Sequence, residues 1–433
     1  MPQNPVKIKP TVIDTSTLGG RAEDGASVFN KLDRVSRVLA PLRQGDVDPL
    51  TVNLDEIISP TVGVILGQKT LLFGTNNYLG LNFDPSCRAA ATEALQREGT
   101  GTTGSRVASG TYAGHIALEK EIAELFGRRA AVVFSTGFQA NLGVISALAG
   151  PDDVILIDRD CHASIYDGCT LSRAKIVRFR HNSPADLERM IKEVGVPGGR
   201  ILIIVEGLYS VTGTIAPLAD FVDIKKRYGA SLLVDEAHSF GVMGKNGLGV
   251  AEDQGVSDDI DVLVGTFSKA VGVIGGFCVS DHPQFHDLRF LARSYLYSAS
   301  LPPPVVAAAR ASIKRIAEAD DLRERLWGNA RRFHKALSEM GYELLADPAP
   351  VIGVVTPGMA EGYRMWRTML ERGLYLNFLV PPSTPNGTFV LRCSLSAEHT
   401  EEQIDRAIEV FGECWDTIVQ GSVSAKPVLS AST

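Results

Sequence analysis

The 433-residue sequence lacks the features that would assign it to several broad classes of protein. No apolar stretch reaches the roughly 18 residues that a membrane-spanning helix needs, and no basic segment followed by an apolar one marks a secretory signal at the N-terminus. Basic residues are not in excess, since 43 Lys and Arg stand against 50 Asp and Glu. A nucleic-acid-binding protein usually has a basic face. We therefore expect no nucleic-acid partner and at most a peripheral membrane contact.

Cysteine and histidine are few and scattered. The six cysteines form no Cys-x-x-Cys pair, and the one His-x-x-x-His spacing among the eight histidines, at His282 and His286, contains a proline and lacks the glutamate of a zinc-protease motif. Zinc sites and disulfide frameworks depend on such spacings. We expect no metal, and the cysteine pattern fits a reducing cytoplasm.

The composition is that of a globular protein, with 45% apolar and 21% charged residues. We predict four regions. Residues 1–60 form a tail and an amphipathic helix, 61–304 a large domain, 305–420 a small C-terminal α+β domain, and 421–433 a flexible tail. Apolar residues recur at helical spacing over 28–42. We expect this helix to pack on the protein or on a partner subunit, with a membrane-surface role as the less favoured alternative.

Short β-rich runs separated by helix-length segments follow from about residue 130. Most runs are continuous in Val, Ile, Leu and Phe, which is typical of strands buried on both faces. The alternation predicts an α/β fold with a doubly wound, mostly parallel sheet. After it we expect a long helix from 305 to about 340, strands at 352–356 and 388–392, and a closing helix from 400 to about 419. The predicted strands of the main sheet are 131–135, 154–158, 175–179, 201–206, 231–235, 261–266 and 276–280.

Ligands of an open parallel sheet bind beyond the carboxyl ends of its strands, and several chemically suggestive residues lie there. Gly137 is in a turn between a strand and a helix, where free N–H groups suit a phosphate, although a plain tight turn has the same pattern. Glu206 and Asp235 each end a strand. Asp235 could stabilise a protonated ring nitrogen or only cap a helix.

Three further residues at this edge could act on the same ligand. Lys269 follows an apolar strand and lies among small residues, so it could form a Schiff base with an aldehyde. His238 could bind a ring oxygen. His162 could stack on a flat ring or act as an acid or base, although a lone histidine is more often structural. A phosphate pocket, an acid for a ring nitrogen, a stacking ring and an amine together match the needs of pyridoxal 5′-phosphate.

Several motifs extend this interpretation to most of the chain, from about Asn53 to Phe411. On these motifs the chain resembles the α-oxoamine synthases, which are pyridoxal-phosphate enzymes of fold type I, the aspartate aminotransferase-like class. The motifs are Thr-Asn-Asn-Tyr-Leu-Gly-Leu at 75–81, Gly-Thr-Thr-Gly-Ser-Arg at 101–106, Phe-Ser-Thr-Gly-Phe at 134–138, His-Ala-Ser-Ile-Tyr-Asp-Gly at 162–168, Asp-Glu-Ala-His-Ser at 235–239 and Gly-Thr-Phe-Ser-Lys at 265–269.

The resemblance implies a role for each cofactor-binding residue. Lys269 would hold the cofactor covalently, Asp235 would pair with the pyridine nitrogen, His238 with the phenolic oxygen, and His162 would stack on the ring. Ser210 would lie near the ring. The phosphate would be held by Gly137, Phe138, Thr266 and Ser268, and by Ser298 reaching across from the other subunit of a homodimer.

The resemblance also implies the substrate contacts. Arg392, with Asn77, would bind the amino-acid carboxylate. Some bacterial members have an arginine just before a Pro-Pro pair that also holds this carboxylate, and here that position is Val380. Recognition of the carboxylate would therefore rest on Arg392 as its one cation.

The expected reaction is a pyridoxal-phosphate-dependent, decarboxylative condensation of L-serine with a long-chain acyl thioester that resembles palmitoyl-CoA. The product would be 3-ketosphinganine, the first intermediate of sphingolipid synthesis. Lys269 would remove the α-proton, and His162 would orient the carboxylate and donate to the developing oxyanion. The alternative is the same chemistry with glycine or alanine and another thioester. An aminotransferase and a catalytically silent partner subunit are less favoured, because Lys269, Asp235 and His162 are all present.

Overall fold

The computed structural model describes residues 27, 29–43 and 47–415, and the chain divides into two compact units. The large unit comprises Asn76–Ser210 and Thr214–Trp327. The small unit comprises the described parts of Met1–Thr75 and Gly328–Thr433, together with Val211–Gly213.

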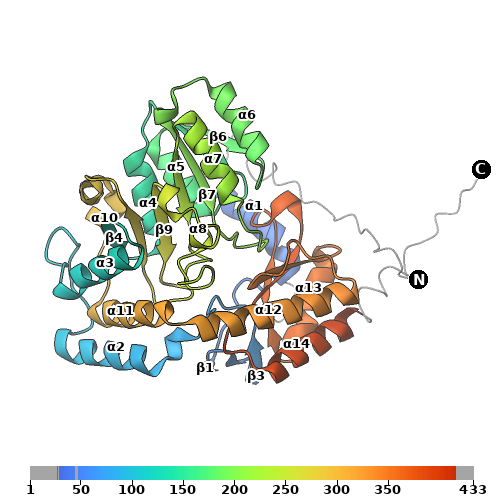
Figure 1. Ribbon diagram of the computed structural model, residues 1–433. Coiled ribbons are helices and arrows are strands. Elements are labelled where there is room, and N and C mark those ends of the chain that lie inside the picture. Colours follow the sequence, from blue (N-terminus) through green and yellow to red (C-terminus); the bar gives the residue numbers. More distant parts are fainter. Residues whose placement is uncertain (1–26, 28, 44–46, 416–433) are drawn as a thin grey trace, which may run out of the picture. The chain divides into compact units, whose positions relative to one another are not determined.

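A seven-stranded sheet forms the centre of the large unit (Figure 1). Its strand order is β4-β10-β9-β8-β7-β5-β6, and all neighbours are parallel except β10, which runs antiparallel to β4 and to β9. This confirms the predicted α/β fold with a mostly parallel sheet. The strands are β4 (Ala130–Phe134), β5 (Val154–Asp158), β6 (Lys175–Phe179), β7 (Ile201–Glu206), β8 (Ser231–Asp235), β9 (Val262–Thr266) and β10 (Gly276–Ser280).

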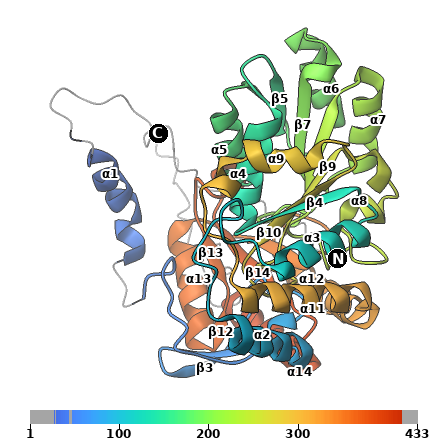
Figure 2. The same ribbon diagram turned by 90° about the vertical axis from the view of Figure 1, so that its left-hand side faces the viewer.

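Helices cover both faces of this sheet, with α4 and α5 on one face and α7 on the other (Figure 2). Every residue of β4, β5, β7, β9 and β10 is buried, which explains their continuous apolar sequences. The edge strand β6 instead exposes Lys175 and Arg178, and charges at an edge oppose pairing with other chains. The helices of this unit are α2 (Pro85–Glu98), α3 (Ala113–Leu125), α4 (Gly137–Leu148), α5 (Ala163–Ser172), α6 (Pro184–Val194), α7 (Leu218–Tyr228), α8 (Val250–Asp253), α9 (Leu288–Leu291), α10 (Arg293–Leu296) and α11 (Pro303–Ala317).

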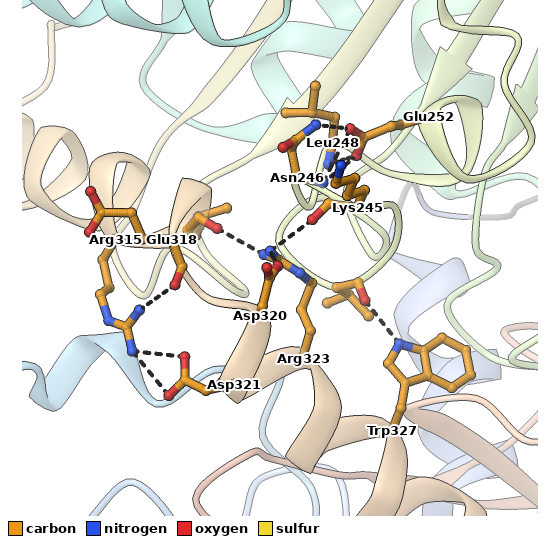
Figure 3. A network of polar contacts seen from close by, with 12 residues as sticks. Lys245, Asn246, Leu248, Glu252, Arg315, Glu318, Asp320, Asp321, Arg323 and Trp327 are labelled. Atoms are coloured by element: carbon orange, nitrogen blue, oxygen red, sulfur yellow. Dashed lines mark hydrogen bonds and ion pairs between the residues drawn. The ribbon is translucent and has the colours of Figure 1, made fainter.

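The long helix predicted over 305–340 is wrong, because two helices occupy this stretch. The first is α11, and the second is α12 (Asp320–Met340). Arg323, which is buried, donates to the carbonyl oxygen of Ile316 at 2.8 Å and so satisfies the end of α11 (Figure 3). The same guanidinium donates to the carbonyl oxygen of Lys245 at 3.1 Å. No glycine or proline lies between the end of α11 and the start of α12, so the sequence does not predict that the helix is interrupted here.

The small unit contains two sheets and helices that cover them. One sheet has the order β1-β2-β3-β12 and the other the order β11-β14-β13. The predicted strands near 352–356 and 388–392 correspond to β11 and β14, whereas β1 to β3 were not predicted. Phe29, Leu32 and Val35 of the N-terminal helical region are exposed, and Val28 lies outside the described residues. The elements are α1 (Asn30–Leu39), β1 (Glu56–Ser59), β2 (Val62–Ile65), β3 (Gln68–Leu72), β11 (Val351–Val355), α13 (Met359–Glu371), β12 (Leu374–Tyr375), β13 (Asn377–Leu379), β14 (Val390–Ser394) and α14 (Glu401–Cys414).

In the described part of the chain, no helix is both long enough and apolar enough to cross a membrane.

Candidate active site

A cavity of about 240 Å³ opens at the carboxyl edge of the central sheet in the large unit. This is the edge at which ligands of open α/β sheets bind. The structure brings eight of the predicted site residues to this one cavity, from the ends of different strands. They are Gly137, Phe138, His162, Asp235, His238, Thr266, Ser268 and Lys269.

The N-terminus of α4 forms one wall of the cavity. Thr136 caps the helix by accepting a hydrogen bond from the N–H of Gln139 at 3.0 Å. The N–H groups of Gly137 and Phe138 make no hydrogen bond with any described residue, and the positive end of the helix dipole lies there. A Cβ at Gly137 would lie 2.8 Å from the side chain of Thr266, so only glycine fits. This wall is suited to an anion such as a phosphate.

Asp235 lies at the floor of the cavity, at the end of β8. Its side chain is 4% exposed, and both oxygens accept hydrogen bonds. One accepts the N–H of Ala237 at 2.8 Å, and the other accepts the side-chain amide of Asn141 at 2.7 Å. Asn141 is one turn of α4 after Gly137 and is itself buried. Because each oxygen of Asp235 accepts a hydrogen bond from a different donor, the carboxylate is held in a fixed orientation.

His162 is exposed at the cavity and is the N-cap of α5. Its backbone N–H donates to a carboxyl oxygen of Glu206 at 2.5 Å. Its ring Nδ1 lies 2.8 Å from the hydroxyl of Ser164 and accepts the N–H of that residue at 3.2 Å. Loss of water around the ring lowers the pKa of His162, an effect that the carboxylate of Asp235 opposes and the charge of Lys269 reinforces.

Glu206 is a second buried carboxyl group beside Asp235. The two residues are register partners at the ends of β7 and β8, and Glu206 is 3% exposed. Burial raises the pKa of Glu206 well above its usual range, and the charge of Asp235 adds to this rise, while Lys269 and the His162 N–H act against it. Ionisation of Glu206 would place a second negative charge beside Asp235 at the floor of the cavity, and this is disfavoured.

Lys269 lies in the turn after β9 and is partly buried. Before it, the hydroxyl groups of Thr266 and Ser268 are 2.7 Å apart, and Thr266 also donates to the carbonyl oxygen of Gly275 at 2.9 Å. The hydroxyl group of Thr266 lies at the N-terminus of α4, since a Cβ added at Gly137 would be 2.8 Å from it.

His238 is buried, and its Nδ1 lies 2.7 Å from the hydroxyl group of Tyr78. Tyr78 is fully buried. Sequence reasoning singled out His238 but not Tyr78, although Tyr78 belongs to the motif at 75–81. Asn141 and Ser164 were also missed as site residues. Each is a polar residue in a helix, and the sequence alone does not show which residue of another element it will contact.

The remaining predicted site residues do not line this cavity. Ser298 accepts a hydrogen bond from the side-chain amide of Gln139 at 2.8 Å. Ser210 is in the turn after β7, and the side-chain amide of Asn77 donates to Asn82 at 2.7 Å. Arg392 is buried on β14 in the small unit. Their roles in substrate and cofactor binding stay predictions.

Comparison with known proteins agrees with this fold. Residues 68–411 match the family model described as aminotransferase class I and II. The match covers more than half of the chain, so the chain belongs to this family.

The relatives narrow the class further. Serine palmitoyltransferase from Caulobacter vibrioides is 48% identical over 366 residues, which cover 84% of this chain and 91% of the relative. Serine palmitoyltransferase from Sphingomonas paucimobilis is 47% identical over 372 residues, or 86% and 88% of the two chains. The 8-amino-7-oxononanoate synthase of Geobacter sulfurreducens is 42% identical over 344 residues, or 79% and 88%. These relatives confirm the resemblance to the α-oxoamine synthases.

Solved structures give the same result. The serine palmitoyltransferase of Sphingomonas wittichii superposes with a TM-score of 0.88 at 48% identity, covering 91% of this chain and all of that one. A structure of serine palmitoyltransferase with pyridoxal phosphate as an internal aldimine superposes with the same TM-score at 44% identity, with the same coverage.

Proposed function

We propose that the cavity binds pyridoxal 5′-phosphate. The free N–H groups at the start of α4 and the hydroxyl groups of Thr266 and Ser268 suit its phosphate. The buried carboxylate of Asp235 suits a protonated pyridine nitrogen, and Lys269 supplies the amine for its aldehyde. The phosphate, the ring nitrogen and the aldehyde of the cofactor thus each have a chemically matching group in a cavity of about 240 Å³.

We infer that the enzyme condenses L-serine with a long-chain acyl thioester, with loss of CO2, to give 3-ketosphinganine. The carrying observation is that an amine, a fixed carboxylate, an imidazole and an anion-binding helix end meet at one cavity. The choice of substrates is supported by the serine palmitoyltransferases among the relatives.

Each residue then has a task in the reaction. Pyridoxal phosphate, when bound, supplies an aldehyde that condenses with amines and a ring that withdraws electrons from the amino acid. Lys269 would hold the cofactor and, as a free amine, would take the α-proton of serine as a general base. Asp235 keeps a proton on the ring nitrogen. His162 donates a hydrogen bond to the substrate carboxylate and to the oxyanion that develops on the thioester carbonyl.

Arg392 and Asn77 are proposed to bind the serine carboxylate. Because Val380 replaces the arginine that some relatives use, this binding would depend on Arg392 as the one cation. The identity to an 8-amino-7-oxononanoate synthase supports a second candidate, in which another small amino acid and another thioester undergo the same condensation.

We further propose that the active enzyme is a homodimer in which Ser298 reaches the phosphate bound by the partner. Large apolar side chains are exposed next to the groups that would hold the phosphate. Phe138 follows Gly137 and is 41% exposed, and Tyr297 precedes Ser298 and is 76% exposed. We place the enzyme in the cytoplasm, because all six cysteines are buried free thiols.

The test is an assay of the purified protein, loaded with pyridoxal phosphate, with serine, glycine and alanine against thioesters of several chain lengths on coenzyme A and on acyl-carrier protein. Mass spectrometry identifies the product. We expect 3-ketosphinganine and CO2 from serine with a palmitoyl thioester. Turnover confined to glycine or alanine would replace this proposal by the second candidate, and ketone formation without CO2 would indicate an aminotransferase.

The matched variants are Lys269→Ala and Lys245→Ala. Lys245 has an exposed side chain, so its variant should retain full activity. Lys269→Ala should lose the absorbance band of the covalently bound cofactor and at least about 100-fold in turnover, the usual minimum for losing a general base. Equal activity of the two variants would contradict the mechanism.

A further inference from the structure

A chain of hydrogen bonds joins His162 to Asp235 beneath the cavity. The side-chain nitrogen of Asn141 donates one hydrogen to Asp235 at 2.7 Å and the other to the hydroxyl oxygen of Ser164 at 3.0 Å. That hydroxyl group lies 2.8 Å from Nδ1 of His162. Asn141 and Ser164 are 3% and 1% exposed, so water cannot replace these partners.

The direction of each hydrogen bond follows from the carboxylate. Both oxygens of Asp235 accept, so the amide nitrogen of Asn141, and not its oxygen, must face it. Both amide hydrogens are then used, and the second one occupies the hydroxyl oxygen of Ser164. The Ser164 hydroxyl hydrogen remains available for Nδ1 of His162, which lies 2.8 Å from the hydroxyl oxygen.

A second donor fixes the state of the imidazole independently. The backbone N–H of Ser164 is aimed at the same Nδ1 from 3.2 Å, and a backbone N–H cannot reverse. A proton on Nδ1 would point at the hydrogen of this N–H group, and the two would repel each other. The neutral imidazole must therefore carry its proton on Nε2, and Nε2 has no hydrogen-bond partner among the described residues.

We propose that Asn141 and Ser164 are positioning residues that lock His162 in the Nε2–H tautomer and connect its imidazole to the carboxylate of Asp235. The proposal rests on the function proposed above, in which His162 donates to the substrate. The lock makes Nε2–H the one donor of the ring, and it resists formation of an imidazolium, which needs a hydrogen on both nitrogens. His162 then acts as a hydrogen-bond donor that does not titrate over the working pH range.

Other charges near the ring do not account for this arrangement. The charged groups that act on His162 are Asp235 at the end of β8, Lys269 after β9 and Asp167 on α5. Glu206 on β7 contacts only the backbone N–H. The two carboxylates favour an imidazolium, whereas Lys269 disfavours it. The orientation of the proton within the neutral ring is set by Ser164 alone.

The test is nitrogen NMR of the full-length protein labelled with ¹⁵N-histidine, recorded over a range of pH before and after addition of pyridoxal phosphate. The His162 signal is assigned by its loss in His162→Gln. The wild type should show the proton on Nε2. In Asn141→Leu the Ser164 hydroxyl group is free to turn and accept, so the pH midpoint for imidazolium formation should rise by about one pH unit.

Two further variants keep the proposal falsifiable if Asn141→Leu folds poorly. Ser164→Ala removes the hydroxyl group but keeps the backbone N–H, so it should retain the Nε2–H tautomer with a raised midpoint. Ser172→Ala is the matched control, because its buried hydroxyl group lies on the same helix and donates to Cys169 at 2.6 Å. It should leave the His162 signal and turnover unchanged. In the assay, Ser164→Ala should lose about tenfold in kcat, with little change in cofactor affinity.

A wild-type signal with the proton on Nδ1, or an identical midpoint in Asn141→Leu, Ser164→Ala and wild type, would overturn the proposal. The NMR measurement needs no substrate. A protein with the Nε2–H tautomer that makes no product from serine would therefore refute the proposed function and leave this inference standing.

Discussion

At the scale of single residues, the tightest steric constraint of the site lies at Gly137. An alanine Cβ there would come within 2.8 Å of Thr266, and relieving such a contact costs about 1–3 kcal/mol. We expect Gly137→Ala to weaken pyridoxal phosphate binding by roughly 10- to 100-fold. The measurement is a titration of the cofactor-free protein followed by absorbance.

The control for this variant is Gly150→Ala. Gly150 lies just beyond the C-terminal end of α4, and a Cβ added there would be 3.8 Å from its nearest neighbour, an oxygen of Asp153. Its cofactor affinity should match that of the wild type. If Gly137→Ala also binds like the wild type, the start of α4 does not hold the phosphate.

His399 makes the stability of the small unit depend on pH. The ring is 4% exposed and stacks on Phe73 with centroids 4.0 Å apart, and Nδ1 accepts the N–H of Ser396 at 3.0 Å. Burial lowers the pKa of His399 to about 3, against roughly 6.5 in an unfolded chain. The unfolded state therefore binds the proton first. The stabilisation that the neutral His399 ring gives the folded state is therefore complete above about pH 6.5 and is lost as the pH falls toward 3.

We expect the free energy of unfolding to fall by up to about 1.4 kcal/mol per pH unit in this window because of this one group. Denaturant titrations at pH 8, 6, 5 and 4 should show a smaller loss in His399→Gln than in the wild type, whatever the difference between them at pH 8. Parallel pH profiles of the two proteins would contradict the assignment.

The sequence predicts individual site residues where a motif places a rare chemical group at a strand end. Lys269, Asp235 and His162 follow such runs, and the structure places all three at one cavity. Asn141 and Ser164 could not be found in this way. Each is an ordinary polar residue on a helix, and its importance comes from a partner on another element.

At the scale of elements, the joint between α11 and α12 depends on a single buried arginine. Replacing Arg323 by methionine removes the donor to the carbonyl oxygen of Lys245 and leaves that of Ile316 with backbone donors alone, and a buried unpaired polar group costs about 1–3 kcal/mol. We expect Arg323→Met to lower the free energy of unfolding by about 1–3 kcal/mol in denaturant titrations.

Arg315→Met is the control from the same network (Figure 3). Arg315 pairs with Asp321, whose side chain is 62% exposed, and such surface pairs contribute about 0–1 kcal/mol. Similar losses in Arg323→Met and Arg315→Met would mean that burial of the arginine is not what matters at this joint.

Elements with a strong burial pattern were predictable, and the others were not. All seven strands of the central sheet lie within one residue of their predicted bounds, because two buried faces produce continuous apolar runs. β1 and β3 are short and largely exposed or mixed in burial, so they leave no comparable pattern. The break between α11 and α12 was missed because a tertiary contact of Arg323, and not a local breaker, ends the first helix.

At the scale of the whole molecule, the proposed homodimer predicts different effects at two exposed apolar residues. Tyr297 is 76% exposed beside Ser298, and burying a charge in an interface without a partner is costly. Tyr297→Glu should shift the protein toward monomer in sedimentation experiments and lower its affinity for pyridoxal phosphate. Ile176→Glu is the control on the edge strand β6, at the other end of the sheet from β4. A monomeric wild type, or equal sedimentation of all three proteins, would contradict the proposal.

The pairing of β4 with β10 has a consequence for the biogenesis of the enzyme. Ala130 is the register partner of Ser280, and β10 is the only neighbour of β4 in the described sheet. A ribosome must therefore deliver about 150 further amino acids after β4 before that strand can be paired. The start of α4 follows β4 directly, so we expect newly made protein to bind its vitamin-derived cofactor only after β10 has been translated.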